Sequence, residues 1–337
     1  MSKKIVIIGF GLIGKALKAK IDKVPGWNIL HIVDKDRTFS ASGEALDSFN
    51  PESPRLDLLI PEGCDLAFLA IPTYDKGETA YCYIRYAVER GIPVVTCEKG
   101  ALSYYWTNLE KFMGKIGYSA TVGGGTRLLP YLKQRVHGRD DVVVHVVVNG
   151  TLNYIFDEMA HAGRSYGEAV EEAQRLGYAE PGATDYLQVL NGEIKDTVMK
   201  TAILFNACMK KSKTMRPDDV SLKLLEKDDL ARLIKESKNR RYIVSFLPPG
   251  NEQENDIIGG FEYECDGWRI SAGFQAINSN PLFLNWLPRG VNNSVLTYEG
   301  DFGEDGIYAL SGPGAGSKPT TASMIRDAKI LLGFGKH

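Results

Sequence analysis

The chain has 337 residues, of which 44% are hydrophobic and 24% charged, and its formal net charge is −2. This length provides for about two domains. Because the sequence has no long basic block, it excludes an electrostatic attraction to nucleic acid or to an anionic membrane. We therefore expect a small-molecule ligand, with no nucleic-acid and no membrane partner.

We further expect a cytoplasmic protein without a metal centre. No apolar stretch is long enough to cross a bilayer, and a strand pattern begins near the N-terminus, where a cleavable signal would otherwise stand. The five cysteines are scattered, which favours reduced thiols over a disulfide framework. The five histidines lack ligand spacing, so the sequence predicts no transition-metal site.

The N-terminal segment is typical of a dinucleotide-binding βαβ unit. An apolar run, residues 5–8, leads into the Gly-x-Gly-x-x-Gly sequence of residues 9–14, and a helix is expected over residues 12–21. The three glycines provide a tight strand exit, room for a pyrophosphate and close packing of helix on strand. The helix directs N–H groups and a positive dipole end at the phosphates. The alternative is a glycine-rich turn in another kind of α/β protein. The expected cofactor contacts here are Gly9, Gly11, Leu12, Ile13, Gly14 and Asp34.

The choice between NAD and NADP depends on the end of the second strand, which is expected over residues 28–33. Asp34 follows this strand, where its carboxylate accepts hydrogen bonds from ribose hydroxyls and repels a 2′-phosphate. Lys35 and Arg37 lie just beyond it and are suited to pairing with that phosphate. Both cofactors therefore stay open.

The pattern then repeats along the chain. Residues 66–71 and 92–96 are short apolar strands, with a helix between them at residues 78–90. Such strands need cover on both faces, so we predict a Rossmann-type, doubly wound parallel sheet. Ligands of these sheets bind at the carboxyl ends of the strands. That position is predicted for Ile71, Pro72, Thr73 and Lys99, although Lys99 could equally be a solvated loop residue.

A second, α+β domain is expected after residue 135. Residues 142–148 are too β-branched for a helix and predict a central strand, in which His145 is a packed core histidine. Helices are predicted over residues 153–162 and 166–176, the latter opened by the capping box of Ser165 and Glu168. The predicted domains are residues 1–135 completed by 305–337, and residues 136–304.

In the helix predicted over residues 196–209, Asp196 and Lys200 lie one turn apart, at the N-terminal end of a stripe of apolar side chains. An exposed pair at this spacing is the ordinary explanation and would contribute only about 0.2–0.5 kcal/mol. Burying charges is costly unless each has a partner or a substrate to meet, so we favour a functional role.

The last part of the chain is predicted to contact the nucleotide cofactor again. Residues 210–256 are polar and predict a mixed, partly solvated region, followed by strands at 257–264 and 268–274. A second glycine loop then precedes a helix expected over residues 320–332, which is again the setting of a phosphate site. Its expected cofactor contacts are Gly314, Ala315 and Gly316.

Assembled in order, these segments resemble the homoserine dehydrogenase family along almost the whole chain. The resemblance implies reversible hydride transfer between nicotinamide C4 and the terminal carbon of L-aspartate 4-semialdehyde, giving L-homoserine. It also implies a homodimer, no metal essential to the chemistry, and the short form without a regulatory module or a fused kinase. The matching segments are Val94–Thr96 before Lys99, residues 121–125, 148–155, 173–180 and 196–204, and Gly312–Gly316.

The resemblance also implies residue roles. Negative charge builds on the aldehyde oxygen during reduction, and an ammonium both stabilises it and supplies the proton. Lys200 and Lys99 match the family's two lysines at that oxygen, Asp196 orients Lys200 and the substrate, and Glu180 pairs with the substrate ammonium. The further substrate contacts expected are Gly150, Thr151, Tyr178, Asp185 and Asn191.

The sequence departs from the family pattern at several positions. Glu98 stands where asparagine usually precedes the crevice lysine, and Ser119 and Arg127 flank the glycine loop of residues 121–125 in place of an acid and a proline. Whether a monovalent cation binds near Thr121–Gly125 is therefore left open. The segment between Glu180 and Asp196 is lengthened, so Asp185 and Asn191 compete for one position. Alternatives are another nicotinamide-dependent amino-acid dehydrogenase on the same scaffold, or a cofactor-binding sensor without turnover.

Overall fold

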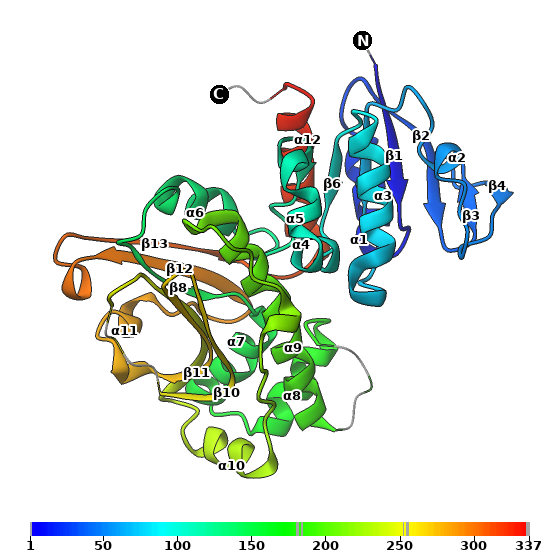
Figure 1. The fold of residues 1–337 in the computed structure, drawn as a ribbon. Coiled ribbons are helices and arrows are strands. Elements are labelled where there is room, and N and C mark those ends of the chain that lie inside the picture. The colour runs from blue at the N-terminus through cyan, green and yellow to red at the C-terminus, as the bar shows by residue number, and fades with distance from the viewer. Residues whose placement is uncertain (1, 180–181, 183–184, 252, 254–255, 335–337) are drawn as a thin grey trace. The chain divides into compact units, whose positions relative to one another are not determined.

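The computed structural model describes residues 2–179, 182, 185–251, 253 and 256–334 (Figure 1). The chain forms two units, Met1–Gly125 with Ser317–His337, and Thr126–Gly316. Each has its own sheet and its own core.

The sheet of the first unit has the strand order β4-β3-β2-β1-β5-β6-β7. Strands β2, β1, β5, β6 and β7 are parallel, as predicted, whereas β3 and β4 extend the edge as an antiparallel hairpin that the sequence analysis did not predict. Only two residues connect β2 to β3, and Lys35 adopts a positive φ of 50° in this turn. The strands are β1 (Lys3–Ile8), β2 (Trp27–Asp34), β3 (Arg37–Phe39), β4 (Ala45–Ser48), β5 (Leu66–Leu69), β6 (Val94–Thr96) and β7 (Ile116–Gly117).

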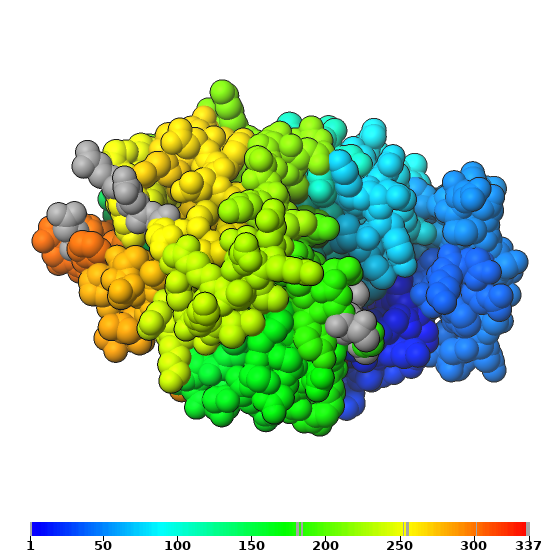
Figure 2. All heavy atoms as spheres, turned by 90° about the horizontal axis from the view of Figure 1, so that it is seen from below, coloured from blue at the N-terminus to red at the C-terminus, as the bar shows by residue number. Residues whose placement is uncertain are grey.

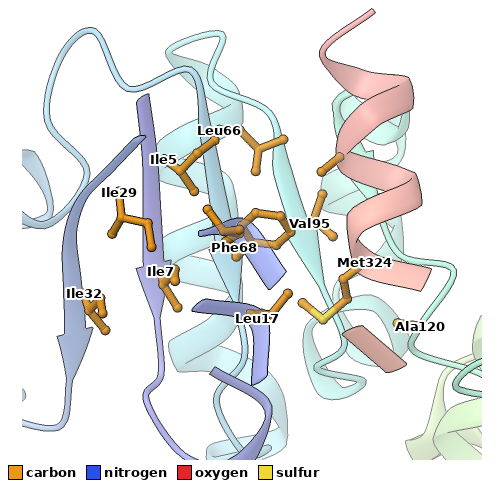
Figure 3. Close-up of a cluster of buried hydrophobic side chains, with 12 residues drawn as sticks. Ile5, Ile7, Leu17, Ile29, Ile32, Leu66, Phe68, Val95, Ala120 and Met324 are labelled. Carbon is orange, nitrogen blue, oxygen red and sulfur yellow. The ribbon is translucent and has the colours of Figure 1, made fainter. Parts of the chain in front are cut away.

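Helices cover both faces of this parallel sheet. On one face, α1 (Leu12–Ile21) and α12 (Ser317–Leu331) place Leu17 and Met324 over Ile5, Ile7 and Phe68, all fully buried (Figure 3). The alternate strand residues are equally buried, and α3 (Glu78–Glu89) packs next to β6. The doubly wound arrangement is thus confirmed. The remaining helices are the short α2 (Leu56–Leu59), α4 (Gly100–Tyr104) and α5 (Trp106–Leu109).

The sheet of the second unit is antiparallel throughout, with the order β10-β11-β9-β8-β12-β13. The β-branched run predicted as a central strand is β8, whose five residues are all buried. Its flanking strand β9 is also buried along its whole length, although the sequence analysis assigned these residues to a partly solvated region. The strands are β8 (Val143–Val147), β9 (Arg240–Leu247), β10 (Ile257–Cys265), β11 (Trp268–Ala276), β12 (Asn292–Glu299) and β13 (Gly306–Pro313).

Each face of this second sheet has its own cover. On one face the ring of Phe156 in α7 lies 4.5 Å from that of Phe274, and the ring of Phe205 in α9 lies 6.5 Å from that of Phe246. On the other face, Phe283 of α11 packs with the core around β8. The helices are α6 (Leu128–Val136), α7 (Gly150–Asp157), a π-helix (Glu158–Ala162), α8 (Tyr166–Arg175), α9 (Tyr186–Cys208), α10 (Lys227–Lys235) and α11 (Phe283–Trp286).

The unit boundaries differ from the predicted domain boundaries. The prediction placed residues 126–135 and 305–316 in the first domain, but α6 packs on α9 and β13 pairs with β12 from Glu299↔Gly306 to Asn292↔Pro313. Both segments therefore belong to the second unit. Of the C-terminal region, it is α12 that belongs to the first unit.

Candidate active site

The glycine turn after β1 has the geometry of a dinucleotide site. Gly9 has a φ of +95°, and a Cβ there would collide with the carbonyl oxygen of Ala70. A Cβ on Gly14 would collide with the carbonyl oxygen of Gly9, so this glycine lets α1 pack against the turn. A Cβ on Gly11 would meet nothing within 4 Å. The fold thus requires Gly9 and Gly14, whereas Gly11 leaves open space at the start of α1, where Leu12 is 76% exposed and Ile13 is half-buried.

Asp34 lies at this turn, at the end of β2. Its Oδ1 accepts a hydrogen bond of 3.1 Å from the N–H of Phe10, which holds the carboxylate beside the glycines. Lys35 follows in the exposed turn of the hairpin and Arg37 begins β3, where its guanidinium lies 3.4 Å from Asp36. The turn therefore presents a fixed carboxylate, with a lysine and a partly neutralised arginine next to it.

Glu98 joins the exits of β5 and β6. Its buried Oε1 accepts 2.5 Å hydrogen bonds from the Thr73 hydroxyl and the Gly100 N–H, and its Oε2 accepts one of 2.9 Å from the Ala101 N–H. These bonds cap the first turn of α4 and tie it to the segment after β5. Glu98, which stands in place of the asparagine usual in the family, is thus a structural anchor between α4 and the segment after β5. This role was not predicted from the sequence.

Lys99 follows this anchor directly and is half-buried at the start of α4. Ile71 is half-buried, while Pro72 and Thr73 are exposed on the neighbouring strand exit. Burial raises the pKa of the Cys97 thiol to about 11, so this residue is no nucleophile at neutral pH. Lys99 is the residue at this exit that the sequence predicted for acid chemistry.

Lys200 and Asp196 form an ion pair on α9. The Lys200 Nζ lies 2.7 Å from Asp196 Oδ2, and the two side chains are 14% and 23% exposed. Nζ also donates a 3.2 Å hydrogen bond to the carbonyl oxygen of Val148, the residue after β8. The ammonium is thus held in place by a carboxylate and a strand-exit carbonyl, which supports the functional interpretation of this pair.

A second residue of α9, Glu193, binds the same strand exit. Its Oε2 accepts a 2.7 Å hydrogen bond from Asn149 Nδ2. Asn149 is also the N-cap of α7, because its Oδ1 accepts from the Leu152 N–H. Neither residue was among the site residues expected from the sequence. The signal for Glu193 was its spacing, three residues before Asp196 and seven before Lys200 on one helix face.

The predicted glycine loop before α12 meets the Lys200 site through Asn293. A Cβ on Gly314 would collide with the Asn293 side chain, whose Nδ2 donates a 3.4 Å hydrogen bond to the Val148 carbonyl oxygen. That oxygen is the one that also accepts from Lys200. Ala315 and Gly316 follow, the latter with a φ of +105°. Asn293 is 1% exposed and is a further residue that the sequence analysis did not single out.

The first turn of α7 brings together three predicted substrate contacts. A Cβ on Gly150 would lie 2.5 Å from the carbonyl oxygen of Val291, so no side chain fits there. The Thr151 hydroxyl donates a 2.6 Å hydrogen bond to the carbonyl oxygen of Tyr178, whose ring packs on that of Tyr154. Glu180, the predicted partner of the substrate ammonium, lies outside the described residues.

The other two candidates have structural roles. Asp185 is the exposed N-cap of α9, accepting from the N–H groups of Leu187 and Gln188. Asn191 donates to the carbonyl of Leu225 at 3.0 Å and accepts from its N–H at 2.8 Å, so both ends of its amide are engaged. This contact joins α9 to the segment before α10, whose atoms adjoin on the surface of the second unit in Figure 2.

The loop of residues 121–125 is tied to α12. The Ser119 N–H donates to Asp327 Oδ2 at 2.8 Å, and the Ser323 hydroxyl donates to the carbonyl oxygen of Gly124 at 2.8 Å. Among the residues that the structure describes, no three His, Cys, Asp or Glu side chains gather to hold a metal ion. None of the helices among the described residues is long and apolar enough to cross a membrane.

Comparison with known proteins identifies the family. A family model described as homoserine dehydrogenase matches residues 129–328, more than half of the chain. The chain belongs to the homoserine dehydrogenase family. Homoserine dehydrogenase of Lactococcus lactis is 26% identical over 97% of this chain and 73% of its own length. The NAD(+)-dependent homoserine dehydrogenase of Pseudomonas canavaninivorans is 28% identical over 81% of this chain and 72% of its own.

Solved structures show the same fold. A hyperthermophilic archaeal homoserine dehydrogenase in complex with NADPH superposes with a TM-score of 0.66 at 21% identity, covering 99% of both chains. The family membership and the α/β fold with a second α+β unit, both expected from the sequence, are therefore confirmed; that the second sheet is antiparallel is a finding of the structure. The chain is a dehydrogenase of this family.

Proposed function

We propose that this chain interconverts L-homoserine and L-aspartate 4-semialdehyde with NAD(P), and that Lys200, Lys99 and Asp196 carry the chemistry. The observation that carries this proposal is the Val148 carbonyl oxygen, on which the Lys200 ammonium and the Asn293 amide of the Gly314 loop meet. A predicted cofactor loop and a predicted catalytic amine are thereby joined through one strand exit.

The residues of the chain fit a dinucleotide. The open space at Gly11 accommodates a pyrophosphate beside the N-terminus of α1, and Asp34 is fixed where a ribose would lie. When bound, the reduced cofactor supplies a hydride from nicotinamide C4. One relative is NAD(+)-dependent and one structural neighbour is an NADPH complex, so both forms are proposed for this chain.

The protein's own part is to manage charge and a proton. As the carbonyl carbon accepts a hydride, its oxygen becomes an alkoxide, and an ammonium within hydrogen-bond distance stabilises it and gives up a proton. Lys200 and Lys99 share these tasks. Asp196 orients the Lys200 ammonium through their 2.7 Å ion pair. In the reverse direction, the neutral amine accepts the hydroxyl proton of homoserine.

The decisive experiment measures oxidation of NADH and of NADPH with aspartate semialdehyde against a panel of keto acids. We expect turnover with the semialdehyde alone. Turnover with a keto acid would show another amino-acid dehydrogenase, and binding without turnover would show a sensor. Titrating each reduced cofactor by fluorescence determines the preferred form, and equal affinities would show that Asp34 does not select.

A homodimer is the proposed assembly, as the family resemblance implies. Light scattering coupled to size exclusion measures it directly, and a monomer mass at micromolar concentration would contradict it. The cytoplasmic location stays a prediction from the sequence.

A further inference from the structure

We propose that the Thr73 hydroxyl accepts a hydrogen bond from the N–H₂ group of the nicotinamide carboxamide, and that Glu98 gives the hydroxyl this acceptor role. Thr73 then positions the ring and distinguishes a carboxamide from other ring substituents. The inference rests on the proposed function, because it takes the ligand at this strand exit to be NAD(P). The sequence predicted a cofactor contact at Thr73 but not which atoms meet.

The first step is the direction of the hydrogen bond between Thr73 and Glu98. The two oxygen atoms, Thr73 Oγ1 and Glu98 Oε1, lie 2.5 Å apart. A carboxylate only accepts hydrogen bonds, whereas a threonine hydroxyl has one hydrogen and two lone pairs. The single hydrogen of the Thr73 hydroxyl is therefore donated to Glu98, and Oγ1 is left to accept from a ligand.

The second step is that Glu98 is fixed in this arrangement. It is 2% exposed, and its carboxylate also accepts from two main-chain N–H groups in the first turn of α4. Its own N–H donates to the Thr96 hydroxyl at 2.9 Å, which in turn donates to the carbonyl oxygen of Leu69, the last residue of β5, at 3.2 Å. An amide at position 98 would offer a donor as well as an acceptor, so it would not hold the Thr73 hydrogen in the same way.

The third step is the orientation of the Thr73 side chain. A Cβ on Gly100 would lie 2.7 Å from Thr73 Cγ2, so the methyl group packs where only a glycine leaves room. The methyl group against Gly100 and the hydroxyl on Glu98 together fix the side chain, although the residue is exposed. Thr73 therefore presents an ordered acceptor at an accessible strand exit.

The fourth step places the nicotinamide half of the cofactor. Strands β2, β1 and β5 are neighbours in this order, with Asp34 at the end of β2 and the open space of Gly11 after β1. A dinucleotide with its adenosine ribose at Asp34 and its pyrophosphate at Gly11 continues toward the exit of β5, where Thr73 lies. On the nicotinamide ring, the carboxamide N–H₂ is the group that donates hydrogen bonds, so it is the group that matches an acceptor.

The test measures binding of two oxidised cofactors to Thr73→Val by isothermal titration calorimetry. The valine keeps the methyl group at Gly100 and removes the hydroxyl, and the 3-acetylpyridine analogue of NAD⁺ keeps the carbonyl but has a methyl group in place of the N–H₂. We expect Thr73→Val to weaken binding of NAD⁺ about threefold to tenfold, the scale of one neutral hydrogen bond, and to change binding of the analogue less than about twofold. Thr73→Ser, which keeps the hydroxyl, and Thr107→Val on the exposed surface of α5 should bind both ligands as the wild type does.

The ratio of the two affinities separates recognition of the N–H₂ group from a structural role. Loss of the contact with Glu98, or of a bond from a ribose hydroxyl, affects both ligands alike and cancels in the ratio. Equal weakening of both ligands in Thr73→Val, weakening of neither, or a larger loss for the analogue would overturn the proposal.

The wild type provides a second measurement that needs no variant. The thionicotinamide analogue of NAD⁺ keeps the N–H₂ group and should bind within about twofold of NAD⁺, whereas the 3-acetylpyridine analogue should bind about threefold to tenfold more weakly. Equal affinities for NAD⁺ and the 3-acetylpyridine analogue would contradict the proposal. If NADP⁺ binds more tightly than NAD⁺, the same tests use NADP⁺ and its analogues.

Failure of the inference can be told apart from failure of the proposed function. If the wild-type chain binds neither cofactor, or does not oxidise L-homoserine, the proposed function is wrong and the inference goes with it. If the wild type binds the cofactor and oxidises L-homoserine, but the affinity ratio is unchanged in Thr73→Val, only the assignment of Thr73 is wrong. Thermal denaturation of each variant shows whether the fold is retained.

Discussion

Two junctions of this protein have the same topology but opposite chemistry. At the exit of β1, the chain enters α1 through Gly11, and no side chain of the described residues caps the helix. At the exit of β8, the chain enters α7 through Asn149, whose side chain accepts the Leu152 N–H. The first junction thus leaves its N–H groups without a side-chain cap, whereas at the second junction one N–H group is capped and the neighbouring Val148 carbonyl oxygen accepts from Lys200.

A helix start without a side-chain cap leaves N–H groups for an anion, which is why we propose the phosphates of the cofactor at the β1 junction. The β8 junction shows the alternative, in which the cap residue Asn149 is itself bonded to α9, the helix that carries Lys200 and Asp196. Perturbing one junction should therefore affect cofactor binding, and perturbing the other should affect turnover.

The largest difference between the effect on turnover and the effect on cofactor binding is expected from Lys200→Ala. Removing the ammonium should lower kcat by at least about a hundredfold, the scale of general acid catalysis, and leave the cofactor Kd within about twofold. Steady-state kinetics and fluorescence titration measure the two quantities. Lys210→Ala is the control, because this exposed lysine pairs with Asp140. Near-normal turnover would remove Lys200 from the mechanism.

Two glycine variants test the role of the first junction, from β1 into α1. Gly14→Ala should cost about 1–3 kcal/mol of unfolding free energy, because its Cβ would collide with Gly9, and should also weaken cofactor binding. Gly11→Ala should leave stability within about 0.5 kcal/mol, because its Cβ meets only open space, and still weaken cofactor binding about tenfold. Urea denaturation and cofactor titration give both values. Unchanged affinity in Gly11→Ala would show that no pyrophosphate lies there.

A third junction, from β6 into α4, is capped by Glu98 and should resemble the second. In Glu98→Gln one oxygen becomes an N–H₂ group that faces an N–H or O–H donor, so we expect a loss of about 1–3 kcal/mol in unfolding free energy. Turnover should fall as well, because Lys99 follows this anchor. Glu89→Gln on the exposed surface of α3 should change stability by less than about 0.5 kcal/mol. Equal effects of the two variants would contradict the anchor role.

A further effect is expected from pH, and it concerns β8, the strand that leads into the second junction. Burial of His145 among Phe283 and Tyr298 lowers its pKa to about 3, below the value of about 6.5 of an unfolded histidine. The unfolded chain therefore binds the proton first. The stability that His145 contributes is present above about pH 6.5 and is lost as the pH falls toward 3, by up to about 1.4 kcal/mol per pH unit.

Urea denaturation between pH 7 and pH 4 measures this dependence. A His145→Asn variant should show a flatter profile than the wild type. A variant of the exposed His137 should keep the wild-type slope. Identical slopes in all three proteins would mean that His145 is not buried in its neutral form.

The sequence predicted those parts of the molecule whose signal is local. The helix expected over residues 12–21 is α1, and the capping box of Ser165 and Glu168 is present as expected. Strand β9 escaped prediction because it begins with Arg240 and Arg241, each 3% exposed. Arg240 is buried by pairing with Glu236 and Asp256. Arg241 donates to two main-chain carbonyls. A hydrophobicity average over neighbouring residues does not report such partners, because it scores an arginine as exposed whatever it pairs with.

The site was predictable to a similar degree. The motifs placed Lys200, Asp196 and the glycines, because their spacing reports one helix face or one turn. They did not place Glu193 or Asn293, whose roles arise from contacts with Asn149 and Val148 across distant parts of the chain. Asn191 is the opposite case. Its position in the sequence suggested a substrate contact, but its side-chain amide is bonded to the backbone of Leu225.

The Glu98 anchor carries an evolutionary consequence. One carboxylate serves Thr73 and the first turn of α4 together, so a shorter amide at position 98 would leave the position-73 hydroxyl without its acceptor. Substitutions at positions 73 and 98 should therefore occur together among descendants of this lineage, and a hydroxyl at 73 should accompany an acid at 98.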